Sequence, residues 1–383
     1  MKKIIILMMV FVVSVFAGGI SSQEIGVPYV EEGRGQVQSA VLTPDGESFY
    51  TLKDEIITNW QLEPIKKLNS FKIKLSEDEK KKKYHMSISS DSKKMIVVTR
   101  KSLLLFDLEK KKLIKKKKDK ISMGVMDGSI FKIIYNKKIL KDNRPIREVV
   151  YREYNIDNLG VIKEVLLPPL CNKSTSGCSA HYMHYINYMY MSADKLFVLK
   201  LDDSIAVFDK TTLKKLEKIW KIWNKCYFSL DKKNLYCTSN TGQYTKINVG
   251  ILETQKIINK EFDNKKSSYI NNEEFIHRKS LNDIYSNISL YKKLSLVFKF
   301  DINDKLTSLN FYDNKLNKRI ATFYQFKNDK WILISSDGYF EVSKNARKYL
   351  KTKTLDGKTT PINDVIYKKY NKNIGLKDSN YSN

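Results

Sequence analysis

A pattern of about 45 residues recurs along the chain and constrains its fold more than any other feature. Each copy is a β-rich run that ends in a large apolar residue, followed by a polar turn and a lysine-rich strand. We call the last residues of these runs the anchors: Trp60, Phe106, Tyr154, Phe208, Ile247 and Tyr312. They are spaced by 46, 48, 54, 39 and 65 residues. Four of these spacings lie near the period of a propeller blade, and the last predicts an insertion.

A second signal precedes most anchors: a strand, a turn rich in serine or aspartate, and another strand. The turn residues Pro44-Asp45-Gly46 and Asp91-Ser92 suit tight hairpins, and the flanking runs are rich in Val, Ile, Tyr and Phe. Each repeat therefore supplies about four short antiparallel strands. The pattern predicts an all-β chain folded as a β-propeller. A β-sandwich is the alternative, but it would lack the repeat.

Residues 89–118 and 191–220 follow the blade plan SxDxxxL…VFDxxxxKxxxxW most closely. In this plan the chain resembles the WD-repeat-like and quinoprotein-like β-propeller superfamily, loosely over residues 24–342. It departs from the pattern because it has no Gly-His pair, and Phe106-Asp107 and Phe208-Asp209 stand where Trp-Asp is expected. The resemblance implies a fold and does not by itself imply a function.

The segment WILISSDGYFEVSKNARKYL, residues 331–350, is similar to an ending found in bacterial WD-repeat-like proteins. The matching positions are Trp331, Asp337, Gly338, Tyr339, Ser343, Asn345 and Tyr349. The resemblance implies that this segment closes the last blade. It predicts a hairpin with a glycine turn and then a helical turn capped by serine.

We expect a strand at residues 24–32 to complete the closing blade from the other end of the chain. Six repeats plus this blade predict seven blades. The predicted propeller domain spans residues 18–350, and residues 351–383 form a polar tail that we expect to be frayed.

The N-terminus has the composition of a secretory signal peptide. Lys2 and Lys3 precede an apolar run over residues 4–16, and a small residue, Ala17, follows. The run is too short to span a bilayer as a mature anchor, although a retained anchor is the alternative. We expect residues 1–17 to be removed. The product is then a bacterial protein of the periplasm or the exterior, without stable membrane insertion.

Four cysteines in an exported protein predict disulfides, and three pairings are possible. We favour Cys171–Cys178 and Cys226–Cys237. The second pair has a geometric basis, because an even-numbered hairpin loop centred near Asp231 places Cys226 directly opposite Cys237.

The formal charge of +27 comes largely from lysine: of 69 basic residues, 8 are arginine and 61 are lysine. Arginine supplies the bidentate contacts that read bases and grip phosphate, so this balance argues against a nucleic-acid partner. The densest run, LFDLEKKKLIKKKKDK at residues 105–120, aligns with the end of a third strand, a turn at 109–112 and an outermost strand at 113–121. Lysines there would repel pairing with other chains.

No motif of a hydrolase, a P-loop or a dinucleotide site occurs, so no catalytic residue or cofactor is predicted. The candidate metal ligands are His181, Met183 and His184, whose soft donors would suit copper. The alternating Met and Tyr residues around them are typical of a half-buried strand, which favours a structural role and no metal.

These features predict an exported, monomeric, non-catalytic propeller that binds a protein partner, whose identity the sequence does not give. Two alternatives remain open. One is a periplasmic enzyme or metal-binding accessory protein built on the propeller. The other is a binder of an anionic surface or glycan, for which affinity would fall steeply with salt.

Overall fold

The structure is a computed structural model. It describes residues 29–30, 37–77, 84–99, 101–119, 123–141, 144–168, 186–191, 194–200, 205–219, 223–228, 234–239, 244–248, 250–252, 254–257, 289–291, 294–301, 306–313, 318–353, 359–372, 374 and 376. Almost all of them lie in antiparallel sheets. The described residues are mostly β and contain several four-stranded antiparallel sheets, as predicted.

Five sheets have four strands each, paired in chain order. The first holds β2 (Ser39–Leu42), β3 (Ser48–Lys53), β4 (Ile56–Gln61) and β5 (Lys66–Lys72). The second holds β6 (His85–Ile88), β7 (Lys94–Val98), β8 (Ser102–Asp107) and β9 (Lys112–Lys118). The third holds β10 (Met123–Asp127), β11 (Ile130–Lys141), β12 (Arg144–Asn155) and β13 (Val161–Leu166). The fourth holds β14 (Ile186–Met191), β15 (Lys195–Lys200), β16 (Ile205–Asp209) and β17 (Lys215–Ile219), and the fifth β18 (Trp223–Phe228), β19 (Asn234–Ser239), β20 (Tyr244–Asn248) and β21 (Thr254–Ile257).

The sixth sheet has six strands: β22 (Ser289–Tyr291), β23 (Leu294–Asp301), β24 (Leu306–Asp313), β25 (Lys318–Gln325), β26 (Trp331–Ser335) and β27 (Phe340–Val342). A small sheet joins β1 (Tyr29–Val30), β28 (Leu350–Lys353) and β29 (Thr359–Pro361). The described helices are two short 3-10 turns, Lys327–Asp329 and Arg347–Tyr349, and α4 (Asp364–Tyr370).

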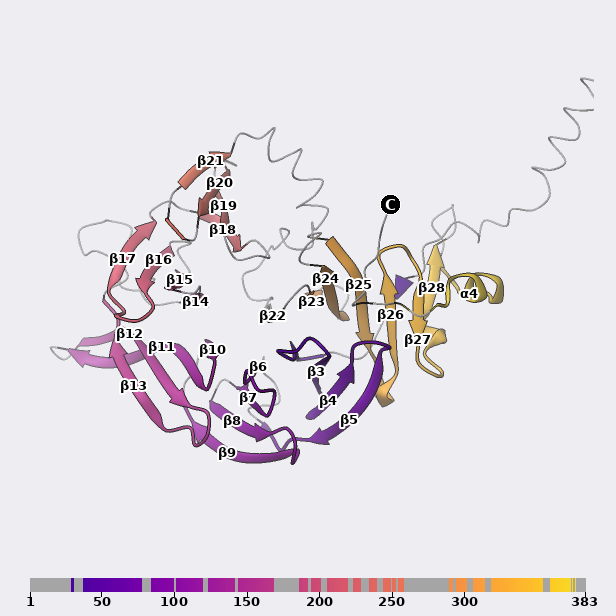
Figure 1. The fold of residues 1–383 in the computed structure, drawn as a ribbon, viewed down its shortest axis with the longest axis horizontal. Coiled ribbons are helices and arrows are strands. Elements are labelled where there is room, and N and C mark those ends of the chain that lie inside the picture. The colour runs from indigo at the N-terminus through magenta and orange to yellow at the C-terminus, as the bar shows by residue number, and fades with distance from the viewer. Residues whose placement is uncertain are drawn as a thin grey trace, which may run out of the picture.

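The four-stranded sheets surround a common centre, as in a β-propeller (Figure 1). The strands β6, β10 and β14 lie toward the centre, and β9, β13 and β17 lie on the outside. Separate apolar cores fill the spaces between the first and second, second and third, third and fourth, and first and sixth sheets. The first sheet therefore packs against both the second and the sixth.

The anchors hold the same structural position in successive sheets. The side chains of Trp60, Tyr154, Phe208 and Ile247 are completely buried, and that of Phe106 is nearly so. A β-bulge between the third and fourth strands lies directly before Trp60, Phe106, Tyr154, Phe208 and Tyr312. Because a bulge bends its strand and increases the twist, the fourth strand turns away from the core at the same point in each of these repeats.

The residue after an anchor shapes the turn that follows. The side-chain oxygens of Asp107, Asn155, Asp209 and Asn248 accept hydrogen bonds from the amides of Lys110, Asp157, Thr212 and Gly250, at 2.8, 2.6, 2.6 and 2.9 Å. Five positions after each of these anchors the backbone is left-handed, with φ of 52°, 53°, 57° and 60° at Lys111, Leu159, Leu213 and Leu252. These repeats therefore share one turn geometry although their sequences are only weakly similar.

The predicted tight hairpins also form. In the first sheet Asp45 Oδ1 accepts hydrogen bonds from Thr43 Oγ1 (2.6 Å) and from the amide of Glu47 (2.8 Å). The second sheet repeats this arrangement, since Asp91 Oδ1 accepts from Ser89 Oγ at 2.6 Å and from the amide of Lys93 at 3.0 Å. The next residue in each turn has a positive φ, 71° at Gly46 and 59° at Ser92.

The C-terminal segment differs from expectation in its pairing. The hairpin of β26 and β27 has the predicted glycine turn, with φ of 82° at Gly338, but it extends the sixth sheet beyond β25. The N-terminal strand β1 pairs with β28 in the separate small sheet, and residues 24–28 lie outside the described part. Ser343 Oγ accepts from the amide of Trp331 at 2.8 Å, so this serine holds the hairpin and does not cap the helical turn at Arg347–Tyr349.

The segment after residue 350 is also more ordered than we expected. It forms β28, β29 and α4, and Asn363 caps α4 by accepting from the amide of Ile366 at 2.8 Å. Ile374 and Leu376 then reach the core between the first and sixth sheets, where both are buried. A frayed tail was the wrong expectation for this described portion, because its few apolar residues find a place against the sixth sheet.

Candidate functional site

The residues predicted for metal binding and for one disulfide, namely Cys171, Cys178, His181, Met183 and His184, lie outside the described residues. The other two cysteines lie on neighbouring strands, and the register places Cys226 directly opposite Cys237. The geometric basis of that disulfide is thus present in the backbone, and the bond itself stays a prediction. Within the described ranges, no three His, Cys, Asp or Glu residues cluster as a metal site would require.

The described part of the chain does present an amphipathic surface on its outer strands. Seven large aliphatic side chains are 39 to 53% exposed there, where a soluble domain usually keeps polar residues. They are Leu68 on β5, Leu113 and Ile114 on β9, Val161, Ile162 and Leu166 on β13, and Leu216 on β17. We call these side chains, with the lysines of the same strands, the rim surface.

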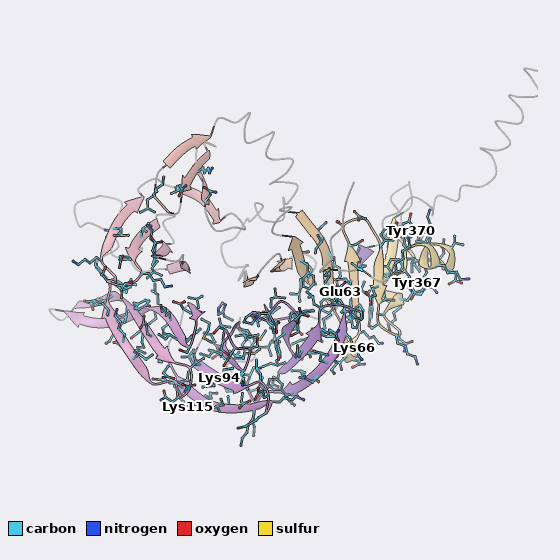
Figure 2. All side chains as sticks on the ribbon, viewed as in Figure 1. Glu63, Lys66, Lys94, Lys115, Tyr367 and Tyr370 are labelled. Carbon is cyan, nitrogen blue, oxygen red and sulfur yellow. The ribbon has the colours of Figure 1, made fainter. Side chains whose placement is uncertain are left out.

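Lysines accompany the aliphatic residues on every one of these strands. β9 is the most basic, with lysine at 112 and at 115–118, and its side chains are exposed except for the half-buried Lys117. Figure 2 shows Lys66 on β5 and Lys115 on the outer side of the ring. The prediction that the lysine run forms a turn and an outermost strand is confirmed, because β9 pairs with β8 and ends the second sheet.

Lys117 differs from the other lysines of β9 because it belongs to the junction with the third sheet. Its Nζ donates to the carbonyl oxygen of Leu159 at 3.0 Å and lies 4.7 Å from the ring centroid of Tyr154. Burial lowers the pKa of Lys117, and the nearby positive charge of Arg152 lowers it further. The cation is nevertheless held by a carbonyl and an aromatic face.

Arg152 is the centre of the same junction. It donates to Glu164 Oε2 from Nε at 2.6 Å and to the hydroxyl oxygen of Tyr154 at 2.8 Å, and it pairs with Asp119. Burial raises the pKa of Tyr154, and its hydrogen bond to Asp119 raises it further, so the phenol stays protonated. Partial burial opposes ionisation of Glu164, but the bond from Arg152 prevails and lowers its pKa. These groups satisfy one another and fix the third sheet against β9.

Lysines bridge other neighbouring sheets as well. Lys94, which begins β7, pairs with Asp157 in the turn before β13, and Lys195, which begins β15, donates to the carbonyl oxygen of Gly250 in the turn before β21, at 2.6 Å. The two lysines occupy equivalent positions in the second and fourth sheets, and each reaches the next sheet along the chain. Part of the lysine content therefore links sheets, whereas Lys112, Lys115 and Lys118 of the rim surface have exposed side chains.

The C-terminal segment forms a second, aromatic cluster beside the ring, where Figure 2 shows Tyr367 and Tyr370 on α4. The ring of Phe340 lies 5.4 Å from that of Tyr367, and Arg347 Nη2 pairs with Asp364 at 2.5 Å. Arg347 also lies 4.4 Å above the ring of Tyr367. These contacts attach α4 to the sixth sheet, so the cluster is part of the fold and the rim surface is the better candidate for binding.

The rim surface was not predicted from the sequence as an apolar feature. The repeat located the outer strands and their lysines. A Leu or Ile on a strand, however, is buried in most contexts, and the exposure of Ile114 follows from the bulge before Phe106, where Ile114 is passed over in the register. The bulge was not visible in the sequence.

The comparisons with known proteins give the following results. No known family matches the chain, and no curated protein does. Among solved structures, the Cps50 (Swd1) β-propeller domain of Myceliophteria thermophila is similar, with a TM-score of 0.44 and 10% identity over 86% of this chain and 98% of that one. The structure of U3-55K gives 0.42 and 11% over 80% and 91%, and the WD40 repeats of RRP9 give 0.43 and 11% over 80% and 90%.

None of the described helices is long and apolar enough to cross a membrane.

The described part of the chain offers an amphipathic outer surface and firmly joined sheets. The chemistry available at that surface is recognition, through aliphatic contact and lysine charge.

Proposed function

We propose that the chain is an exported, non-catalytic β-propeller that serves as a protein-interaction scaffold in the periplasm or outside the cell. The observation that carries the proposal is the rim surface, on which aliphatic side chains are exposed on the outer strands of four successive sheets. Exposed apolar groups rimmed by charge are typical of a surface that another protein covers. Export rests on the N-terminal sequence, and a monomeric state is part of the same proposal.

The proposal also includes a blade number. We favour six blades over the seven expected from the sequence. The first sheet packs on both the second and the sixth, and the small sheet of β1, β28 and β29 lies beside the ring in Figure 1. The segment at 331–342 then enlarges the last blade and does not add another. An experimental structure with a seventh radial sheet would contradict this count.

The functional proposal is tested by capturing partners of the tagged chain in the periplasm with a cross-linker. The informative variant is Leu113→Ser with Ile114→Ser, which removes the apolar part of β9. A matched control is Ile251→Ser with Val365→Ser, because those side chains are more exposed and lie off the outer strands. We expect the first variant to lose a cross-linked partner that the wild type and the control retain. Equal capture by all three proteins would contradict the rim surface as the binding site.

A second candidate function is binding to an anionic surface or glycan. The five lysines of β9 favour it, since a strand with no acidic residue concentrates positive charge. It predicts binding of the unmodified protein to anionic vesicles or sulfated glycans, and affinity that falls steeply as salt rises. The candidate residues of the metal-binding alternative lie outside the described part, and no described feature favours that alternative or the enzyme alternative.

A further inference from the structure

The open edge of β9 is the most unusual feature of the rim surface. In the described part of the chain β9 pairs with β8 alone. The amide of Asp119 donates to the carbonyl oxygen of Lys101 at 2.9 Å, which fixes the orientation of the strand. Because amide directions alternate along a strand, the amide of Lys118 faces the outer side. An edge of this kind is a template for one more strand.

The lysines lie on both faces of this edge. Lys115 is paired with Leu105, whose side chain enters the core shared with the third sheet, and Lys118 is paired with Ser102. Since residues paired across a ladder share a face and adjacent residues alternate, Lys115 and Lys118 extend to opposite faces. Any strand that pairs with β9 therefore meets lysine on either side of the sheet.

This charge determines which strand the edge accepts. A second copy of β9 would place lysine against lysine, which destabilises pairing, so self-association through this edge is disfavoured. A strand of opposite charge changes the repulsion to attraction while the backbone bonds stay the same. The outer strand β13 lacks this selectivity because its six residues include one lysine and one glutamate.

We propose that β9 binds an extended acidic segment of a partner protein, which adds to the second sheet as a fifth strand. Acidic residues of the partner lie opposite Lys115 and Lys118, and aliphatic residues lie opposite the exposed Leu113 and Ile114. The backbone ladder gives the complex its geometry, and the lysines select the partner. This inference rests on the proposed scaffold function and names the chemistry of its partner.

The first experiment uses a fluorescent peptide as long as β9, which has 7 residues. The antiparallel sequence Glu-Thr-Glu-Glu-Val-Val-Glu places acids and valines as the proposal requires. Its control, Glu-Pro-Glu-Glu-Pro-Val-Glu, keeps all four glutamates but cannot complete a ladder, because proline lacks the amide proton. We expect the purified protein to bind the first peptide about tenfold more tightly than the second, as measured by anisotropy. Equal binding would overturn strand addition, since a simple polyanion site would not distinguish the two.

The second experiment changes the protein. Lys115→Ser with Lys118→Ser is expected to weaken binding of the acidic peptide about tenfold, whereas Lys344→Ser with Lys368→Ser removes the same charge elsewhere and leaves binding unchanged. Lys115→Glu with Lys118→Glu should instead bind Lys-Thr-Glu-Lys-Val-Val-Glu, which places lysine opposite each new glutamate and glutamate opposite Lys112 and Lys116. Circular dichroism confirms that each variant is folded. A loss shared equally by the control pair would assign the binding to net charge and overturn the site.

Vesicles containing phosphatidylglycerol separate this proposal from membrane binding. If the vesicles bind the wild type and neither peptide does, the lysines serve an anionic bilayer and the strand proposal fails. The scaffold proposal has its own outcome. If a cross-linked partner is lost on Leu113→Ser with Ile114→Ser but kept on Lys115→Ser with Lys118→Ser, the scaffold stands and only the acidic strand is overturned.

Discussion

The strands β9 and β25 occupy the same place in their repeats, yet their surroundings are opposite. Each is the fourth strand of its unit, pairs with the strand that carries the anchor, and holds the extra residue of a β-bulge. β9 ends its sheet and is exposed along nearly its whole length, whereas β25 is covered by β26 and buries most of its central residues. The repeat therefore fixes the position of a strand, whereas the neighbour beyond that strand determines the side chains it carries.

The two sequences match their environments. β9 reads KLIKKKK and β25 reads KRIATFYQ, so both begin with basic residues, but only β25 continues as an apolar strand. The cover over β25 consists of β26 and β27, and the stacking of Phe326 on Tyr349, with ring centroids 4.2 Å apart, secures the following turn. An edge without such a cover is protected from aggregation by charge.

The largest expected effect is on the covered strand. Phe323 is completely buried in β25, with its ring 5.3 Å from that of Phe49 and 5.2 Å from that of Trp60. Phe323→Ala should lower the free energy of unfolding by about 3–5 kcal/mol because it leaves a cavity between two sheets. Lys115→Ala on the exposed β9 should change it by less than about 0.5 kcal/mol. Chemical denaturation measures both, and similar losses would contradict the contrast between the strands.

The next effect concerns the open strand. Replacing Lys115, Lys116, Lys117 and Lys118 with serine removes the charge that protects the edge, so we expect the protein to aggregate more readily. Light scattering during incubation at constant concentration measures the change. The single variant Lys117→Ser is the comparison, because Lys117 binds the neighbouring sheet and its loss leaves the exposed charge of β9 in place. A quadruple variant that stays monomeric would show that this edge needs no charge.

A smaller effect is expected from weakening the hairpin of β26 and β27, which covers β25. Ser343 Oγ accepts the amide of Trp331 at 2.8 Å, where β26 begins. Ser343→Ala should cost about 1 kcal/mol, since it leaves a part-buried amide without that acceptor. Ser336→Ala is the matched control, because that side chain is exposed in the turn between β26 and β27. Hydrogen exchange at the Trp331 amide should also become faster in Ser343→Ala alone. Equal exchange rates in both variants would show that Ser343 does not hold the start of β26.

The sequence predicted the features that depend on neighbouring residues. The anchors, the aspartate turns at Asp45 and Asp91, the glycine turn at Gly338 and the outer position of β9 all follow from local patterns, and the structure confirms them. These features are predictable because turn geometry requires particular residues within a few positions.

The features that the sequence did not predict depend on distant partners. The pairing of β1 with β28 joins segments more than 300 residues apart in the sequence, and no local pattern specifies which strand β1 joins. The apolar residues of the C-terminal segment, such as Ile374 and Leu376, are too few and too irregularly spaced to indicate burial. Whether a polar segment folds back is decided by the surface that receives it. Four of the exposed aliphatic residues of the rim surface, Leu68, Ile114, Ile162 and Leu216, are similarly the residues that the bulges pass over in the register.

The smallest expected effect is a gain in the stability of the cover on β25. Glu341 lies on β27, where burial raises the pKa of its carboxyl above the ordinary 4.5 although the amide of Ile374 donates to Oε2 at 3.4 Å. The folded protein therefore holds this proton more tightly than the unfolded chain does. The contribution of this proton to stability is fully present below the ordinary pKa and is lost as the pH rises through the raised one.

Glu341→Gln keeps the acceptor and removes the charge, so its advantage in stability over the wild type should be absent in acid and grow toward neutral pH. Denaturant midpoints compared across this range measure the difference. A constant difference would mean that the carboxyl is as well solvated in the folded protein as in the unfolded chain, and that the cover carries no buried charge.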